Sequence, residues 1–217
     1  MSGTDDAGGS PPCFLHELDP AYSGVTDAQT ARDVARWRKA ERARLIEARM
    51  ALSQAKRAAF GERIPATLDA LLPDLEGLTV STYWPFRGEP DLRGWMGAVI
   101  YRGGACALPV VVEKAAPLIF RPWTPGCAMT RGVWDIPIPE TGPEVVPDVV
   151  IAPVVGFDPE GYRLGYGGGF YDRTLAKLGP RRVIGVGYAG QAIPTIFPQP
   201  HDVPMGEIVT EAGRVFP

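Results

Sequence analysis

The chain has 217 residues, a length that favours one domain, and it contains an unusually large number of glycines (26) and prolines (23). Hydrophobic residues make up 45% and charged residues 22%, so the chain can build a core, which argues against global disorder. The net charge is −3, glycine shows no three-residue period, and no apolar run approaches the roughly 20 residues that cross a bilayer. We therefore expect a soluble globular protein with many loops, and neither a collagen-like nor a membrane-spanning one.

Residues 1–24 are rich in Gly, Ser and Pro and predict a disordered leader that lacks the features of a signal peptide. Cys13 and His16 have a metal-like spacing in this leader, but zinc sites usually need four ligands. The three cysteines are too scattered for a disulfide framework, which favours reduced thiols in the cytoplasm. Residues 25–217 are expected to form a single α/β domain.

Residues 32–63 form a basic segment. They contain ten basic and four acidic residues and so carry +6, which leaves −9 for the rest of the protein. Such a segment indicates an anionic ligand or a nucleic acid. Thr26 and Gln29 are a candidate capping box for a helix that reaches about residue 50, and most of its basic side chains are expected to be solvated. Ser53 is a candidate N-cap of a second helix, expected to end before Pro65.

Three strands are predicted in the middle of the chain. Residues 78–84 (LTVSTYW) and 117–123 have strand character, as do residues 105–112 (ACALPVVV). Pro109 should place the last of these at a sheet edge or a bulge, because proline cannot donate a ladder hydrogen bond. Six prolines within residues 121–147 predict a long, stiff excursion over the surface.

The second half of the chain predicts a parallel sheet. Residues 148–155 (DVVIAPVV) are almost wholly apolar, as in strands that are buried on both faces. A helix is expected over residues 170–178, ended by Gly179 and Pro180, and another buried strand over residues 183–188. This alternation predicts an α/β fold, a layered and mostly parallel sheet flanked by helices, with a basic N-terminal helix.

The most informative stretch is 156–173, GFDPEGYRLGYGGGFYDR, between a predicted buried strand and a predicted helix. Four of its glycines, Gly165, Gly167, Gly168 and Gly169, fall within five consecutive positions. Without side chains, backbone N–H groups can converge on an oxyanion in front of the helix N-terminus. The stretch therefore predicts a phosphate site, with a mobile glycine turn as the alternative.

The loop follows neither of the two common nucleotide motifs. No Lys-Ser/Thr pair follows at the Walker A spacing, and Phe170 stands where the dinucleotide fingerprint requires a small residue. Arg163 and Arg173 flank the loop and can neutralise phosphates, while Asp172 can hold Mg²⁺. These charges favour a phosphate site over a simple turn.

RLGYGGGFYDR preceded by GFDPEG resembles the 5-formyltetrahydrofolate cyclo-ligase family, the methenyltetrahydrofolate synthetases. Weaker matches follow the family's order over about residues 36–210: Arg42 and Ser53, YWPFRGE at 83–89, WDIPIP at 134–139, and His201 with Asp202. The resemblance implies a fold like that of NagB, RpiA and the CoA transferases. It also implies ATP- and Mg²⁺-dependent conversion of 5-formyltetrahydrofolate to 5,10-methenyltetrahydrofolate, with release of ADP and phosphate.

In that reaction ATP phosphorylates the formyl oxygen, N10 attacks the activated carbon, and phosphate leaves as the ring closes. Positioning and charge stabilisation can carry such chemistry without a covalent nucleophile. The lack of a Ser-His-Asp or Cys-His arrangement in the sequence is consistent with this.

The resemblance also implies roles for individual residues. The nucleotide would be bound by Arg38, Arg42, Arg163, Gly165, Tyr166, Gly167, Gly168, Gly169 and Tyr171. The folate would contact Trp84, Glu89, Gly168 and Phe170, with Arg163, Phe170 and Tyr171 at the reaction centre. Asp172 and Asp202 would hold Mg²⁺.

The sequence departs from the family pattern at two places. Arg38 stands where lysine is usual, and the two side chains bind phosphate differently. Residues 90–92 (PDL) replace a threonine-containing continuation after Glu89. These departures leave open a family paralogue that binds a nucleotide and a folate-like ligand without cyclising it.

We further expect a cytoplasmic monomer or weak homodimer, with neither a membrane nor a nucleic-acid partner. A nucleic-acid-binding protein is the third hypothesis, because of the basic segment. It is disfavoured because only Trp37 and Phe60 interleave with the basic residues as stacking partners, and because the rest of the chain is acidic.

Overall fold

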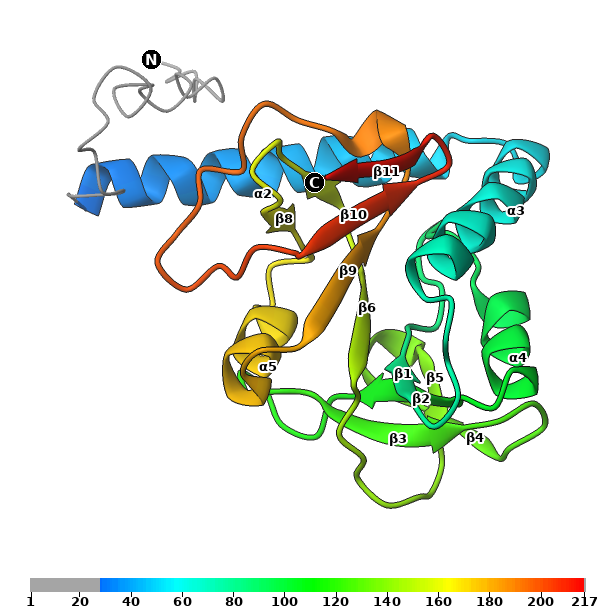
Figure 1. The fold of residues 1–217 in the computed structure, drawn as a ribbon. Coiled ribbons are helices and arrows are strands. Elements are labelled where there is room, and N and C mark those ends of the chain that lie inside the picture. Colours follow the sequence, from blue (N-terminus) through cyan, green and yellow to red (C-terminus); the bar gives the residue numbers. More distant parts are fainter. Residues whose placement is uncertain (1–27, 217) are drawn as a thin grey trace, which may run out of the picture.

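A computed structural model describes residues 28–216, and its centre is a seven-stranded sheet. The strands of this sheet are β1 (Thr79–Ser81), β2 (Ala105–Val110), β3 (Ile119–Trp123), β6 (Val149–Pro153), β9 (Arg182–Val186), β10 (Glu207–Thr210) and β11 (Gly213–Phe216). Their order is β11-β10-β9-β6-β1-β2-β3 (Figure 1). The pairs from β10 to β2 are parallel, whereas β3 and β11 run antiparallel to their neighbours. The predicted α/β fold with a mostly parallel sheet is confirmed.

Helices cover both faces of the sheet. They are α2 (Ala28–Met50), α3 (Gln54–Leu71), α4 (Arg93–Tyr101) and α5 (Phe170–Leu178). On β6, Val149 and Ile151 pack with side chains of α3 and α4, whereas Val150 and Ala152 pack with Leu175 of α5. Because successive side chains of a strand point to opposite faces, the unbroken apolar run predicted at residues 148–155 serves both layers (Figure 1).

The predicted helix end before Pro65 is wrong. The N-cap is confirmed, since the Ser53 hydroxyl accepts a hydrogen bond from the Lys56 backbone N–H at 3.2 Å. However, α3 continues past Pro65, and Ile64 and Leu68 on either side of it are fully buried. Burial of this face outweighs the one helical hydrogen bond that the proline removes.

The predicted edge position of Pro109 is also wrong, because β2 lies between β1 and β3. Pairing with β1 ends at Ala107, and Pro109 lies beyond that point, opposite Phe120 of β3. The proline therefore removes no hydrogen bond from the β1–β2 ladder. Proline is therefore tolerated in an interior strand here, because it lies where it removes no hydrogen bond to β1.

The proline-rich excursion over residues 121–147 carries regular structure that the sequence did not predict. It contains a hairpin of β4 (Met129–Arg131) and β5 (Pro137–Pro139), with a 3-10 turn, η1 (Val133–Asp135), at its tip. Both strands of a two-stranded ribbon have one unpaired edge, so prolines are tolerated there. A second small ribbon joins β7 (Gly156–Phe157) to β8 (Arg163–Leu164), and a further 3-10 turn is η2 (Ala189–Gln191).

One helix and two strands of the main sheet were also not predicted: α4, β10 and β11. Helix α4 has two glycines among its nine residues, a composition that hides a helix. Trp95, Met96 and Val99 are buried in the main core, and their packing stabilises α4 despite those glycines. Tertiary contacts therefore override local propensity in this segment.

The order of the strands indicates where a ligand binds. From β1, the chain adds β2 on one side and then β6, β9 and β10 on the other. In open parallel sheets, a crevice forms at the carboxyl ends of the strands where this winding reverses. Leu45 of α2 packs with Val155 and Leu164 of the segments that follow β6, which fixes α2 across this end of the sheet.

The predicted leader, the capping residue Thr26, and the pair Cys13 and His16 lie outside the described residues. Over residues 28–216, no helix is both long enough and apolar enough to cross a membrane. In the same part of the chain, no three His, Cys, Asp or Glu side chains gather as a metal-binding group.

Candidate active site

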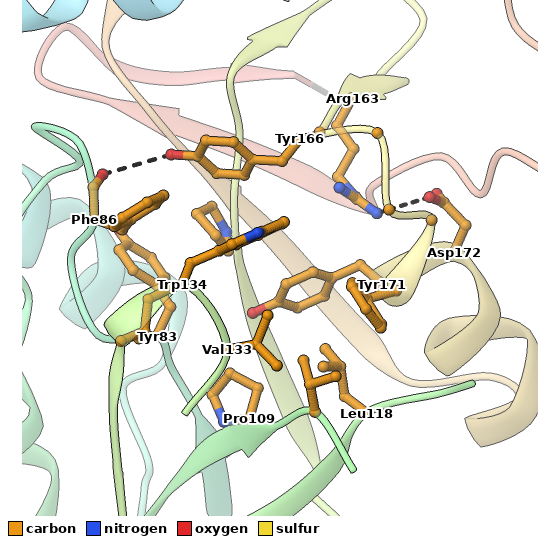
Figure 2. Close-up of a pocket in the computed structure, with 18 of the residues that line it drawn as sticks. Tyr83, Phe86, Pro109, Leu118, Val133, Trp134, Arg163, Tyr166, Tyr171 and Asp172 are labelled. Carbon is orange, nitrogen blue, oxygen red and sulfur yellow. Dashed lines mark hydrogen bonds and ion pairs between the residues drawn. The ribbon is translucent and has the colours of Figure 1, made fainter. Parts of the chain in front are cut away.

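A pocket at the carboxyl ends of β1 and β6 brings together the residues that the sequence predicts for the site, with the exception of Arg173. They are Arg38, Arg42, Trp84, Glu89, Arg163, Gly165, Tyr166, Gly167, Gly168, Gly169, Phe170, Tyr171, Asp172 and Asp202. The pocket walls come from α2, the segment after β1, the β4–β5 hairpin and the glycine loop (residues 165–169) (Figure 2). Residues 164 positions apart in the sequence meet here, so the fold builds the pocket from distant segments.

The glycine loop needs its glycines for two physical reasons. Gly169 is the N-cap of α5 at φ 62°, in the left-handed region that favours glycine. At Gly165 the reason is space, because a Cβ would lie 2.5 Å from an Nη atom of Arg163. Helix α5 begins at Phe170, so the positive end of its dipole lies beside the loop. The loop is thus suited to a closely approaching anion.

Four arginines surround the loop, namely Arg38, Arg42, Arg163 and Arg173, and the last of them donates through Nη2 to the Gly168 carbonyl oxygen from outside the pocket. Arg42 Nε donates to the Gly165 carbonyl oxygen at 2.7 Å. The Nε atoms of Arg38 and Arg163 are buried and have no hydrogen-bond partner among the described residues. A buried donor without a partner costs about 1–3 kcal/mol, so these atoms are poised for an anionic acceptor.

Each of the two predicted metal-binding carboxylates is paired with one of these arginines. Asp172 lies 3.0 Å from Arg163 Nη2, and Asp202 lies 3.0 Å from Arg38 Nη2. Carboxylate oxygens suit Mg²⁺, which commonly takes one or two of them together with substrate phosphates. The donor chemistry therefore fits Mg²⁺, although no three acidic, His or Cys side chains of the described residues gather as a metal-binding group.

The other half of the pocket is aromatic. Phe86 and Trp134 are stacked, with ring centroids 6.1 Å apart and planes 9° apart, and Tyr166 lies 5.7 Å and 5.8 Å from these two rings. Figure 2 shows these rings beside the aliphatic side chains of Leu118 and Val133. Walls of this kind suit a flat heterocyclic ligand.

The tip of the β4–β5 hairpin holds Trp134 in an unusual backbone conformation. Trp134 and Asp135 both have positive φ, 58° and 61°. Such non-glycine residues cost on the order of 1–3 kcal/mol each and cluster at functional sites. The sequence marked Trp134 only as part of a family motif, with no role in the site.

Glu89 is the buried acid of the aromatic half. Its Oε1 accepts a hydrogen bond from the Tyr166 hydroxyl at 2.8 Å, and its Oε2 accepts one from the Phe86 N–H at 2.9 Å. Burial raises the pKa of Glu89 to about 7, against the opposing effects of the Arg49 charge and of these two hydrogen bonds. A buried acid with a perturbed pKa that lines a pocket marks a functional residue.

The sequence missed one cation of this site. Arg36 and Arg44 of α2 are largely exposed, as predicted for its basic residues, but the Arg49 side chain has no exposed surface. Arg38, Leu45 and Arg49 are buried at spacings of seven and four, which place them on one helix face. This spacing is the signal that could have separated Arg49 from its solvated neighbours.

The pocket lies where the winding of the sheet reverses, and it combines a glycine loop, paired arginines and carboxylates, and an aromatic wall. These features define the class of α/β enzymes whose site suits a phosphate-bearing ligand beside a flat one. Residues 34–211 match the model of the 5-formyltetrahydrofolate cyclo-ligase family. The chain belongs to this family, which confirms the resemblance seen in the glycine loop.

Individual relatives support this assignment. The 5-formyltetrahydrofolate cyclo-ligase of Mycolicibacterium smegmatis is 31% identical over 178 residues, covering 78% of this chain and 91% of the relative. That of Escherichia coli K12 is 31% identical over 170 residues, covering 75% and 93%.

Solved structures give the same result for the fold. The 5,10-methenyltetrahydrofolate synthetase of Aquifex aeolicus has a TM-score of 0.71 and 29% identity, over 82% of this chain and 91% of that one. The synthetase of Mycoplasma pneumoniae has a TM-score of 0.67 and 24% identity, over 80% of this chain and 98% of that one, and supports the fold alone.

Proposed function

We propose that the protein converts 5-formyltetrahydrofolate to 5,10-methenyltetrahydrofolate and consumes ATP in the presence of Mg²⁺. The observation that carries this proposal is one pocket with two unlike halves. Unpartnered arginine donors and a glycine loop suit a polyanion, and an aromatic wall with a buried acid suits a flat heterocycle. The proposed reaction has one substrate of each kind.

The nucleotide would lie against the glycine loop. Arg38, Arg42 and Arg163 would donate to its phosphates, and the loop glycines would allow close approach of the backbone. Asp172 and Asp202 would hold Mg²⁺, which when bound neutralises phosphate charge. Each of the two carboxylates is now paired with an arginine, and bound phosphates and Mg²⁺ would replace these partners.

The folate would lie in the aromatic half. Glu89 would accept hydrogen bonds from the N–H groups of the pterin ring, and Trp84 and Phe170 would pack against the ligand. The stacked rings of Phe86 and Trp134 would cover it and exclude water. Exclusion of water matters, because an activated formyl group would otherwise be hydrolysed.

The reaction centre would lie where the two halves meet. The Arg163 guanidinium lies 5.1 Å from the ring centroid of Tyr171, and Tyr171 and Phe170 line the pocket beside it. A cation there would stabilise negative charge on the phosphoryl group as it passes to the formyl oxygen. The chain would thus act by positioning and electrostatics.

Absorbance at the methenyl chromophore tests the proposal directly. Purified protein, 5-formyltetrahydrofolate, ATP and Mg²⁺ should give product, and omission of ATP or chelation of the metal should abolish it. Absence of product under the complete conditions would overturn the proposal. Nucleotide-dependent thermal stabilisation without turnover would favour the alternative, a binding paralogue, which the arginine at position 38 motivates.

We also propose a cytoplasmic enzyme that is a monomer or weak homodimer and binds neither membranes nor nucleic acids. Trp37 is the aromatic residue of α2 and packs edge-on against Phe197, with ring centroids 4.8 Å apart, so it is engaged within the protein, which supports the last point. RNA binding that weakens with added salt would contradict it. Sedimentation over a range of protein concentrations would measure the assembly state.

A further inference from the structure

Arg49 is a fully buried cation at the end of α2, and it contacts the segments on both sides of the winding reversal. Its Nε donates to the Arg87 carbonyl oxygen at 2.9 Å, in the segment after β1. Its Nη1 donates to the Val154 carbonyl oxygen at 3.3 Å, directly after β6. A buried charge is tolerated only when it is paired and hydrogen-bonded, and this geometry meets that condition.

The third contact of Arg49 leads to the ligand-facing acid. Its Nη2 donates to the Tyr166 hydroxyl at 2.5 Å, and the same hydroxyl donates to Glu89 Oε1 at 2.8 Å. Arg49 Nη2 also lies 3.9 Å from Glu89 Oε1. A hydroxyl has one proton to donate, and Glu89 Oε1 at 2.8 Å is a nearer acceptor for it than the Phe86 carbonyl oxygen at 3.5 Å. The order of donation is therefore Arg49 to Tyr166 to Glu89.

We propose that Arg49 is a positioning residue for the folate: it orients the Glu89 carboxylate through Tyr166 and ties that carboxylate to the glycine loop. The inference rests on the proposed function, since it assigns Glu89 to the folate. It adds a link between the two halves of the pocket, because Tyr166 belongs to the loop that would bind the nucleotide. Arg49 would therefore set the distance between the two substrates.

The electrostatic surroundings of Glu89 support this role. The groups that act on it or respond to it come from several elements: Arg49, Tyr83, Tyr166, Tyr171 and Tyr188. Arg49 is the cation of this set, and its charge lowers the pKa of Glu89, which burial raises to about 7. Loss of this charge would raise the pKa further and protonate Glu89 at neutral pH.

Two substitutions separate charge from shape. Arg49→Met keeps the length of the side chain without its charge, and Arg49→Lys keeps the charge without the planar fork. Arg44→Met is the matched control, because Arg44 lies on the same helix with an exposed side chain. Calorimetric titration with 5-formyltetrahydrofolate, without ATP, would measure affinity at several pH values between 6 and 9.

We expect Arg49→Met to bind folate about fivefold more weakly at pH 7 and to recover at higher pH, since a rise of one unit in a pKa of about 7 lowers the ionised fraction of Glu89 at pH 7 from about one half to about one tenth. Arg49→Lys should lose less affinity and keep the wild-type pH profile, and Arg44→Met should match wild type. The same comparison by ¹³C NMR of the labelled Glu89 carboxyl should show a raised pKa in Arg49→Met. This second readout is independent of the folate.

Folded Arg49→Met with wild-type affinity and an unchanged pH profile would overturn the inference while the proposed function stands. A wild type that binds no folate would overturn both, whatever the NMR titration shows. If Arg49→Met fails to fold, Tyr166→Phe replaces it, because it removes the relaying hydroxyl and leaves Arg49 in place. Wild-type folate affinity in folded Tyr166→Phe and Arg49→Lys would then overturn the inference.

Discussion

The two halves of the pocket carry charge in different ways. On the glycine-loop side, charges occur as Arg–Asp pairs, Arg38 with Asp202 and Arg163 with Asp172, close to the pocket surface. On the aromatic side, a single acid, Glu89, is buried against rings and depends on one cation behind the wall. In the proposed function, the first half would exchange its partners for phosphate and metal, whereas the second half would have to keep its partner to remain ionised. Charge removal should therefore reduce turnover in the first half and affinity in the second.

The largest effect is expected from Arg163→Ala. Its guanidinium would stabilise the transferred phosphoryl group, and removal of one such stabilising donor typically costs about 100-fold or more in kcat. Arg181→Ala is the control, because Arg181 is exposed directly before β9 and does not line the pocket. Steady-state kinetics would measure the difference, with melting curves to confirm folding. Wild-type turnover in folded Arg163→Ala would remove Arg163 from the reaction centre.

Glu89→Gln should act mainly on folate affinity. A hydrogen bond to a charged group is worth about 1.5–3 kcal/mol, so we expect roughly 10- to 100-fold weaker folate binding at pH 8. The KM for ATP should change little, because the arginines and the glycine loop lie in the other half of the pocket. Equal losses for both substrates would contradict the division into two halves.

Glu89→Gln should weaken folate binding but increase the stability of the protein at neutral and higher pH. The folded-state pKa of Glu89, about 7, lies above its ordinary value of 4.5, so the folded state binds the extra proton and wild-type stability falls as pH rises between these values. Glutamine does not ionise, so the free energy of unfolding of Glu89→Gln, relative to that of wild type, should increase by up to about 3 kcal/mol between pH 5 and pH 8. Urea unfolding at both pH values would measure this gain. A difference that is constant with pH would contradict the raised pKa.

Trp134→Ala tests the wall of the aromatic half. Loss of the stacked ring should raise the KM for folate by roughly 5- to 10-fold, since aromatic pairs contribute about 0.5–1.5 kcal/mol beyond their buried area. Tyr101→Ala removes an exposed ring outside the pocket and should leave kinetics unchanged. A larger change in the KM for ATP than in the KM for folate would show that Trp134 belongs to the nucleotide half of the pocket.

The smallest effect is expected from Arg38→Lys, which restores the residue that the family pattern favours. Lysine keeps the positive charge opposite Asp202 but offers no planar fork. We expect a change of about threefold or less in the KM for ATP, since lysine keeps the charge near the phosphates and loses only the Nε donor of Arg38. A tenfold change would show that this chain has adapted its nucleotide site to arginine.

Much of the fold was predictable because it depends on local pattern. The apolar run that became β6, the Ser53 cap of α3 and the helix after the glycine loop each follow from neighbouring residues. The failures occur where distant contacts decide: α3 passes through Pro65, and Pro109 lies in an interior strand. At Pro65 the packing of α3 outweighs the lost helical hydrogen bond. At Pro109 no hydrogen bond to β1 is lost, because pairing with that strand has already ended.

The sequence by itself determined the composition of the glycine loop and of the charges that flank it, because these residues follow one another in the chain. It did not determine which of the many arginines of α2 face the pocket. Arg44 and Arg49 are the same residue type on the same helix, yet one is exposed and the other has no exposed surface. Only the tertiary structure decides this, since the burial of a charge depends on the carbonyl oxygens, hydroxyl and carboxylate that other segments bring to it.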